Sequence, residues 1–311
     1  MVNTGSSGRV PDPGARLRSL MDDHCVGLPG AFNGLVARAA AAAGFEGCYV
    51  SGAAVSASFG VPDVGMVSLN EFCAVIEQVA RASGLPVIAD ADTGFGESEM
   101  AARTVHEYAR AGAAGLHIED QVFPKRCGHL DGKQLVPIDH MQEKVRAAAK
   151  ARDRCSGGSF IICARTDARG VEGLDAAVQR ARAYVEAGAD MIFPEGLQSQ
   201  DEFARFAGAL NGPPTPGRRP RTYLLANMTE FGKTPMIPLR RFGEMGYSCV
   251  IWPVTTLRAA MGEVTRMLAD LKRDGDVSAF VDRLQTREQL YRLLGYEPGK
   301  EWEWPGPAPR S

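Results

Sequence analysis

Two aspartates separated by one residue, in the motif Asp90-Ala-Asp92, follow the apolar run Pro86-Val-Ile-Ala. In a strand, residues two apart point to the same face, so these carboxylates are expected to lie together, beside Glu119 of the next strand. Carboxylates this close repel each other, and a hard cation such as Mg²⁺, which binds oxygen ligands and retains waters, relieves the repulsion. The motif predicts a Mg²⁺ site, and an aspartate pair that caps the following helix is the alternative.

Cys127 lies in the segment Lys125-Arg-Cys-Gly-His129. Cationic side chains and an imidazole beside a thiol are expected to lower its pKa, which favours proton transfer near neutral pH. The other six cysteines lie in apolar runs and are expected to be inert core residues. We therefore predict that Cys127 transfers a proton; a chance thiol in a loop and a basic surface patch are the alternatives.

Arg165 and Arg258 follow two of the apolar runs. An arginine in an apolar setting requires a carboxylate partner, which it holds with two parallel hydrogen bonds. For Arg165 that partner is either a substrate or an internal acid, Glu195 or Asp167. A site that combines a metal ion with arginines suits a small polycarboxylate substrate.

The elements that position these residues follow one repeated theme, in which short β-branched runs alternate with Ala-rich stretches of helical periodicity. The predicted strands are 24–28, 47–51, 86–90, 115–119, 160–165, 191–195, 222–227 and 249–253. Strands that alternate with helices form a parallel sheet, and runs that are apolar on both faces are covered on both sides. Eight units over about 230 residues predict an α/β fold, a (β/α)8 TIM-type barrel, rather than an open doubly wound sheet.

Polar residues stand at the carboxyl ends of six of these strands. In a barrel those ends converge on one mouth, which is where active sites of this fold lie. The long gap between Glu119 and Arg165 contains Cys127 and predicts a lid over that mouth. The polar residues are Ser51, Asp90, Asp92, Glu119, Asp120, Arg165, Asp167, Glu195 and Asn227.

The composition excludes several classes of protein. The 311 residues are 45% hydrophobic and 23% charged, with a net charge of −2, which is typical of a globular protein. The chain has no basic excess for nucleic acid and no apolar run long enough for a membrane or a signal peptide. Seven cysteines without Cys-x-x-Cys spacing indicate reduced thiols and a cytoplasmic location.

Together, the cysteine segment, the aspartate pair and the strand Gly115-Leu-His-Ile-Glu-Asp120 resemble the isocitrate lyase/phosphoenolpyruvate mutase superfamily. The resemblance extends from about Leu28 to Tyr296. Within the superfamily, the segment Asn227-Met-Thr-Glu-Phe-Gly-Lys-Thr-Pro235, Arg258 and Gln285-Thr-Arg287 are most similar to 2-methylisocitrate lyases. The resemblance therefore implies cleavage of 2-methylisocitrate to pyruvate and succinate, in the methylcitrate cycle of propionate catabolism.

The resemblance also implies roles for individual residues. Asp90 and Asp92 would hold Mg²⁺, with Asp63 and Glu119 reached through water. The implied catalytic residues are Tyr49 as a base for the substrate hydroxyl, Cys127 as the acid that protonates the succinate half, Lys125 to offset negative charge, and His129. The implied substrate-binding residues are Ser51, Gly52, Ala53, Cys127, Gly128, Arg165, Glu195, Asn227, Thr229, Arg258 and Arg287.

The resemblance further implies a homo-oligomer, a tetramer whose subunits exchange a C-terminal helix. Three helices are expected after the last strand, at 256–273, 277–283 and 286–294. We expect a flexible N-terminus at 1–15, a single barrel domain with C-terminal helices at 16–296, and a flexible tail at 297–311. The alternatives are a carboxyphosphonoenolpyruvate mutase or 2,3-dimethylmalate lyase of the same superfamily and, more remotely, a non-catalytic barrel that binds a metabolite.

Overall fold

The computed structural model describes residues 12–126, 128, 132–213 and 222–303. All eight predicted strands are confirmed, with ends within two residues of those expected. Their bounds are β1 (Val26–Pro29), β2 (Cys48–Val50), β3 (Val87–Asp90), β4 (Gly115–Glu119), β5 (Ile161–Thr166), β6 (Met191–Pro194), β7 (Tyr223–Asn227) and β8 (Cys249–Trp252).

The strands pair in parallel in the order β1-β8-β7-β6-β5-β4-β3-β2. The two edge strands of this order are joined by a bridge between Gly30 and Tyr49, where the amide of Ala31 donates to the carbonyl of Tyr49 at 2.8 Å. The sheet is therefore a nearly closed barrel, and the predicted (β/α)8 fold class is confirmed.

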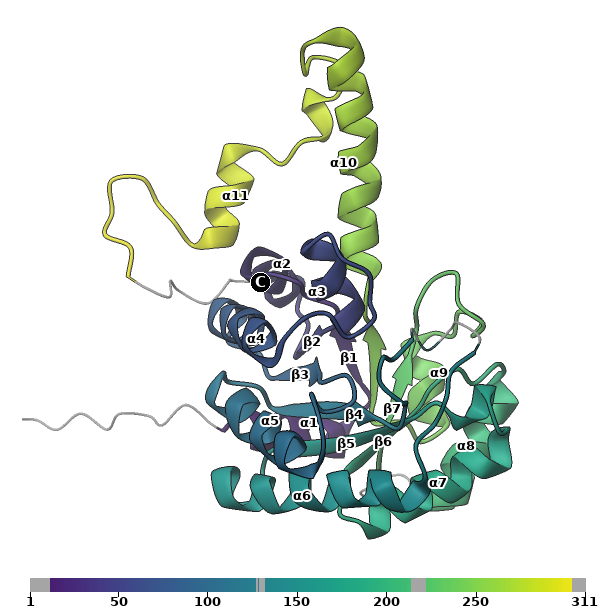
Figure 1. Ribbon diagram of the computed structural model, residues 1–311. Coiled ribbons are helices and arrows are strands. Elements are labelled where there is room, and N and C mark those ends of the chain that lie inside the picture. Colours follow the sequence, from purple (N-terminus) through teal and green to yellow (C-terminus); the bar gives the residue numbers. More distant parts are fainter. Residues whose placement is uncertain (1–11, 127, 129–131, 214–221, 304–311) are drawn as a thin grey trace, which may run out of the picture.

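Helices follow the strands and cover the outside of the barrel (Figure 1). A large outer cluster of buried apolar residues lies between the helices and the sheet, while a smaller one lies within the barrel. Because both faces of each strand are buried, the strands are apolar throughout. The helices are α2 (Gly34–Ala42), α3 (Gly52–Ser58), α4 (Leu69–Ser83), α5 (Ser98–Arg110), α6 (Ile138–Ser156), α7 (Leu174–Glu186), α8 (Gln200–Asn211) and α9 (Leu239–Glu244).

An additional helix, α1 (Pro13–Asp23), covers the amino-terminal end of the strands. Leu17 and Met21 of this helix belong to the inner apolar cluster, and the Nε of Arg18 donates to the carbonyl of Ser159, just before β5, at 2.9 Å. The sequence analysis did not predict this helix, which begins inside the stretch expected to be flexible. The available signal was Asp12 followed by Pro13: Asp12 caps the helix by accepting a hydrogen bond from the amide of Ala15 at 3.0 Å, and proline is favoured in the first turn.

The chain after β8 forms an arm that projects from the barrel (Figure 1). Helix α10 (Thr255–Asp274) buries none of its residues, and α11 (Arg287–Leu294) returns to α2, where Arg38 donates to the carbonyls of Leu293 and Leu294 at 2.8 and 3.0 Å. Two of the three predicted tail helices are confirmed. The prediction for 277–283 is wrong in extent, because only a short 3₁₀ turn forms at Val281–Arg283.

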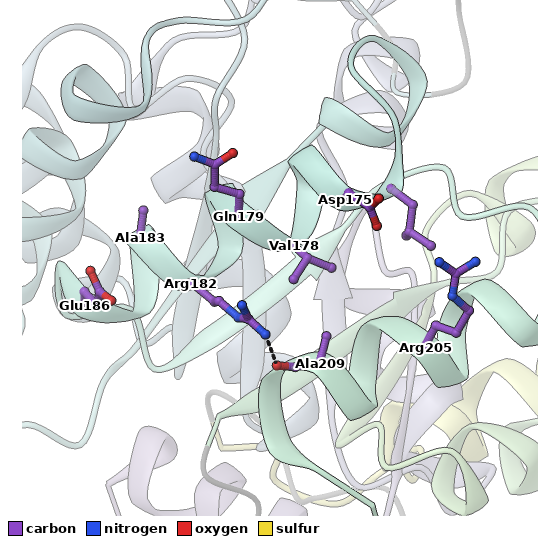
Figure 2. Close-up of a pocket in the computed structure, with 9 residues that line it drawn as sticks. Asp175, Val178, Gln179, Arg182, Ala183, Glu186, Arg205 and Ala209 are labelled. Carbon is purple, nitrogen blue, oxygen red and sulfur yellow. Dashed lines mark hydrogen bonds between the residues drawn. The ribbon is translucent and has the colours of Figure 1, made fainter.

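A groove of about 720 Å³ runs between α7 and α8 on the outer layer (Figure 2). It is lined by side chains of these helices, including Arg182, which donates to the carbonyl of Ala209 at 2.9 Å. The strand ends that carry the predicted site residues do not contribute to it. Within the described ranges, no helix is both long and apolar enough to span a bilayer.

Candidate active site

The carboxyl ends of β2 to β7 bring most of the predicted site residues to the same mouth of the barrel. The parallel register places Asp90 beside His117 and Glu119 beside Arg165 on neighbouring strands. These four side chains are buried, although each is charged or titratable. Such a concentration of buried polar groups at the carboxyl end of a barrel indicates a functional site.

The aspartate pair is held in place by backbone amides. One oxygen of Asp90 accepts a hydrogen bond from the amide of Gly52 at 3.1 Å, and the other accepts from the amide of Asp92 at 3.0 Å. Asp92 adopts a φ of 45°, a left-handed conformation that is uncommon for aspartate. Burial and the nearby charge of Asp90 raise the pKa of Asp92 to about 6. This arrangement brings the two carboxylates together, as the motif predicted.

Lys125 supplies a buried cation to this acidic group. Its Nζ lies 2.8 Å from Oδ1 of Asp92 and also contacts Oδ1 of Asp63. The ammonium group is almost completely enclosed, and burial of an unpaired charge would be costly. Lys125 therefore links the cysteine segment to the predicted metal-binding residues.

Arg165 lies at the centre of a second charged group. Its guanidinium nitrogens lie 2.9 Å from Asp167, 3.2 Å from Glu119 and 3.5 Å from Glu195, and the group stacks on the ring of Phe193. The internal ion pairs considered as the alternative for Arg165 are therefore present. They hold the guanidinium at the mouth, where it is also placed to bind a substrate carboxylate.

Tyr49 contacts a histidine that the sequence analysis did not single out. The Tyr49 hydroxyl lies 2.7 Å from Nε2 of His117, and both side chains are buried. Burial, with a contribution from Asp90, raises the pKa of Tyr49 well above its usual value of 10. Burial lowers the pKa of His117 to about 4, so the imidazole is neutral at pH 7. The period of two along β4, which places His117 on the face of Glu119, was the available signal.

Two glycines of the site leave no space for a side chain. A Cβ at Gly52 would lie 2.7 Å from a carboxylate oxygen of Asp90, and a Cβ at Gly128 would lie 2.4 Å from Nη2 of Arg165. Distances this short exclude any larger residue unless the neighbouring group moves. Both predicted substrate-binding glycines are therefore in direct contact with charged residues of the mouth.

Four further predicted residues lie around this group. Ser51 caps α3, and its Oγ accepts from the amide of Ala54 at 3.4 Å. Asn227 donates from Nδ2 to Glu195 at 3.1 Å, while its Oδ1 is buried without a hydrogen bond in the described part of the chain. Ala53 is half-buried in the first turn of α3, and Thr229 is buried just beyond β7.

Arg258 and Arg287 are not brought into the cluster within a single chain. Arg258 is exposed, contacts the carbonyl and carboxylate of Glu230, and lies over the ring of Phe231. Arg287 is exposed at the start of α11 on the arm. Cys127 and His129 lie outside the described residues.

The oxygens available at the mouth fit an open Mg²⁺ site. Across the described ranges, no three His, Cys, Asp or Glu side chains form a closed protein site for a metal. Mg²⁺ commonly uses one or two protein carboxylates and completes its shell with water and substrate oxygens. Asp90 and Asp92 provide the two carboxylates. In the described structure, neither buried oxygen of Glu119 makes a hydrogen bond; Oε2 lies 3.2 Å from Arg165, which leaves Oε1 for a water ligand.

A (β/α)8 barrel with buried acids and bases at its carboxyl-terminal mouth is the architecture of an enzyme. The chain belongs to the phosphoenolpyruvate phosphomutase family, whose model matches residues 17–272. The predicted superfamily is thereby confirmed. The chain is 52% identical to the probable 2-methylisocitrate lyase 1 of Corynebacterium glutamicum, over 90% of this chain and 88% of that protein. It is 46% identical to the 2-methylisocitrate lyase of Bacillus subtilis, over 90% and 89% of the two chains.

Solved structures of the same superfamily match the whole barrel. A crystal structure of 2,3-dimethylmalate lyase has a TM-score of 0.83 and 39% identity, covering 91% of both chains. A crystal structure of phosphonopyruvate hydrolase in complex with oxalate and Mg²⁺ has a TM-score of 0.77 and 31% identity, over 91% of this chain and 95% of that one.

Proposed function

We propose that this chain is a Mg²⁺-dependent lyase that cleaves a carbon–carbon bond of 2-methylisocitrate to give pyruvate and succinate. The observation that carries the proposal is the barrel mouth, where the Asp90 and Asp92 carboxylates lie together, Lys125 pairs with Asp92, and Arg165 pairs with Glu119 of the neighbouring strand. Relatives up to 52% identical are named as 2-methylisocitrate lyases, which favours this substrate among those of the superfamily.

Asp90 and Asp92 would hold the Mg²⁺ ion, with Asp63 and Glu119 acting through water. When bound, the ion supplies stabilisation of negative charge on substrate oxygens. The phosphonopyruvate hydrolase structure that contains Mg²⁺ supports a metal-dependent reaction in this superfamily. Lys125, in contact with Asp63 and Asp92, adds positive charge on the same side of the mouth.

Tyr49 and His117 would take the proton from the substrate hydroxyl. Because burial disfavours tyrosinate, Tyr49 is a poor base by itself. Its hydroxyl oxygen can accept the substrate proton while its own proton passes to Nε2 of His117, 2.7 Å away. Because burial disfavours the imidazolium, this proton would leave again to solvent, and the Cys127 thiolate would take up a proton before the next cycle. The bond between the hydroxyl-bearing carbon and its neighbour then breaks, its electron pair remains on the succinate half, and the hydroxyl carbon becomes the ketone of pyruvate.

Cys127 would donate the proton that completes succinate. Arg165, Gly128 and the amides of Gly52 and Ala53 would bind and orient substrate carboxylates, with Ser51, Glu195, Asn227 and Thr229 around them. We retain His129 as a catalytic residue, and Arg258 and Arg287 as partners of the third carboxylate. Arg258 would have to exchange its contact with Glu230 for the substrate.

We also propose that the chain forms a homo-oligomer, a tetramer, through the arm. Helix α10 buries no residue and exposes apolar side chains, including Met261 and Leu268, both about half exposed. An amphipathic helix without a packing partner is unfavourable in water, and a second copy would cover it. Light scattering coupled to gel filtration gives the number of subunits, and a monomeric mass would contradict the proposal.

A cytoplasmic location and a role in propionate catabolism complete the proposed function. The six described cysteines are free, which is compatible with a reducing compartment. A strain without the gene should fail to grow on propionate, and unimpaired growth would contradict the proposed role.

A pyruvate assay tests the proposed reaction. The purified chain with Mg²⁺ and 2-methylisocitrate is followed through a coupled dehydrogenase that consumes pyruvate, and succinate is measured at the end point. Parallel reactions contain 2,3-dimethylmalate or carboxyphosphonoenolpyruvate. Equal release of pyruvate and succinate supports the proposal, whereas turnover of only one of the other substrates would assign the chain to a different branch of the superfamily.

A further inference from the structure

Lys133 is a buried lysine at the mouth that the proposed reaction does not use. Its Nζ donates to Oδ1 of Asp167 at 2.8 Å and to the carbonyl oxygen of Gly128. Its side chain is only 5% exposed. Because a buried ammonium is costly unless it is paired and hydrogen-bonded, these two acceptors fix its position.

Asp167 connects Lys133 to Arg165. Its carboxylate is completely buried and accepts two hydrogen bonds from the guanidinium of Arg165, at 2.9 and 3.2 Å, in addition to the one from Lys133. Burial alone would raise the pKa of Asp167, but the two cations outweigh this effect and lower it to about 2. Asp167 is therefore an anion between two cations, and the position of each cation depends on the other.

Gly128, in the cysteine segment, contacts both Arg165 and Lys133. Its missing Cβ would lie 2.4 Å from Nη2 of Arg165 and 2.5 Å from Cγ of Glu195, so its backbone packs directly against both. The carbonyl of the same residue is held by Lys133. Gly128, Lys133, Asp167 and Arg165 thus form one continuous set of contacts.

We propose that Lys133 is a positioning residue that fastens the backbone at Gly128 to Asp167 and thereby sets Arg165 in the place where it binds a substrate carboxylate. The role of Arg165 toward substrate rests on the proposed function. The attachment of Gly128 to Asp167 through Lys133 is independent of the proposed function, because it follows from the contacts alone.

The test compares Lys133→Met with a matched control, Arg152→Met. Arg152 makes the same kinds of contact at the other end of the barrel: its guanidinium donates to the carbonyl of Gly188 at 3.1 Å and to Asp190 at 2.8 Å, with a further hydrogen bond to the exposed Asp153 at 2.9 Å. Both variants replace a cation by an unbranched apolar side chain and remove hydrogen bonds to a backbone carbonyl and an aspartate. The control therefore reports how much stability such a replacement costs when the contacts of Lys133 with Gly128 and Asp167 remain intact.

In the coupled assay, Lys133→Met should raise KM about tenfold or more, the effect expected for loss of a charged hydrogen bond, while Arg152→Met leaves KM unchanged. A Lys133→Met enzyme with the KM and kcat of the wild type would overturn the proposal. So would an Arg152→Met enzyme with the same rise in KM, because the effect would then be one of general stability.

A second measurement is independent of turnover. Limited digestion with trypsin, followed by mass spectrometry, gives the rate of cleavage after the exposed Arg126. Loss of the contact at Gly128 should speed this cleavage about tenfold in Lys133→Met but not in Arg152→Met. If the wild type releases no pyruvate from 2-methylisocitrate, the proposed function fails, and this digestion alone decides the inference: equal rates in the two variants would overturn it.

Discussion

The hydroxyl of Tyr49 lies 2.7 Å from Nε2 of His117, inside the carboxyl end of the barrel. His117 is neutral at pH 7 because burial lowers its pKa to about 4, and the cations Arg165 and Lys125 act in the same direction. Burial therefore disfavours both tyrosinate and imidazolium, and at rest the two groups form a neutral hydrogen-bonded pair. In the proposed reaction, this pair would receive the proton of the substrate hydroxyl.

Tyr49→Phe should lower kcat about 10²- to 10⁴-fold, the range for loss of a general base, with a small effect on KM. The ring remains, so packing is preserved. Tyr247→Phe is the matched control, because Tyr247 is also buried but its hydroxyl contacts the carbonyl of Phe203 away from the mouth. Steady-state kinetics of both variants provide the check, and a Tyr49→Phe enzyme with normal kcat would remove Tyr49 from proton transfer.

Removal of the metal should abolish activity reversibly. Asp92→Asn removes one of two carboxylate ligands, so Mg²⁺ should bind at least about tenfold more weakly in a calorimetric titration. Asp190→Asn, which changes a carboxylate paired with Arg18 and Arg152 instead, should bind Mg²⁺ like the wild type. Full activity in the presence of a chelator would contradict the metal assignment.

Cys127→Ser should lower kcat by about 10² or more, because a hydroxyl is a much weaker acid than a thiol. The fold should be unaffected, as judged by circular dichroism and the midpoint of thermal unfolding. Cys155→Ser, at an exposed thiol on α6, is the control and should be fully active. A Cys127→Ser enzyme that turns over at the rate of the control would exclude Cys127 as the acid.

The charge of Asp167 should make stability depend on pH in acid. Its pKa is about 2 in the folded chain against an ordinary value of 3.8, so the ionised form stabilises the fold above pH 4. This contribution, about 2 kcal/mol, is lost as the pH falls from about 4 toward 2. The difference in free energy of unfolding between wild type and Asp167→Asn should shrink over this interval; a difference independent of pH would show that Asp167 does not titrate as described.

Helix α1 should support stability without influencing catalysis. Leu17 is fully buried in the inner cluster, at the end of the barrel opposite the site. Leu17→Ala should reduce the free energy of unfolding by about 2–5 kcal/mol, through lost transfer energy and a cavity. Denaturant titration measures this loss, and the folded variant should keep wild-type kcat and KM. A large change in KM would show that the two ends of the barrel are coupled.

Much of the barrel was predictable because its signals are local. Each strand is a short apolar run, each connecting helix has its own periodicity, and parallel strands necessarily align their carboxyl ends. This is why Asp90, Asp92, Glu119, Arg165 and Glu195 could be assigned to one mouth before any contact was known. Helix α1 was missed although Asp12 and Pro13 give a local start signal; what shows that it belongs to the barrel is its packing on the inner cluster, which only the tertiary structure reveals.

The amino-acid sequence alone thus determined the strands, the mouth and the residue types gathered there. Only the tertiary structure decided which side chains touch: Tyr49 with His117, Lys125 with Asp63 and Asp92, and Lys133 with Gly128 and Asp167. It also decided that Arg258 faces Glu230 while Arg287 lies on the arm. Periodicity fixes the face on which a residue lies. The partner of a long charged side chain instead depends on the balance of desolvation and pairing among residues that are far apart in the chain.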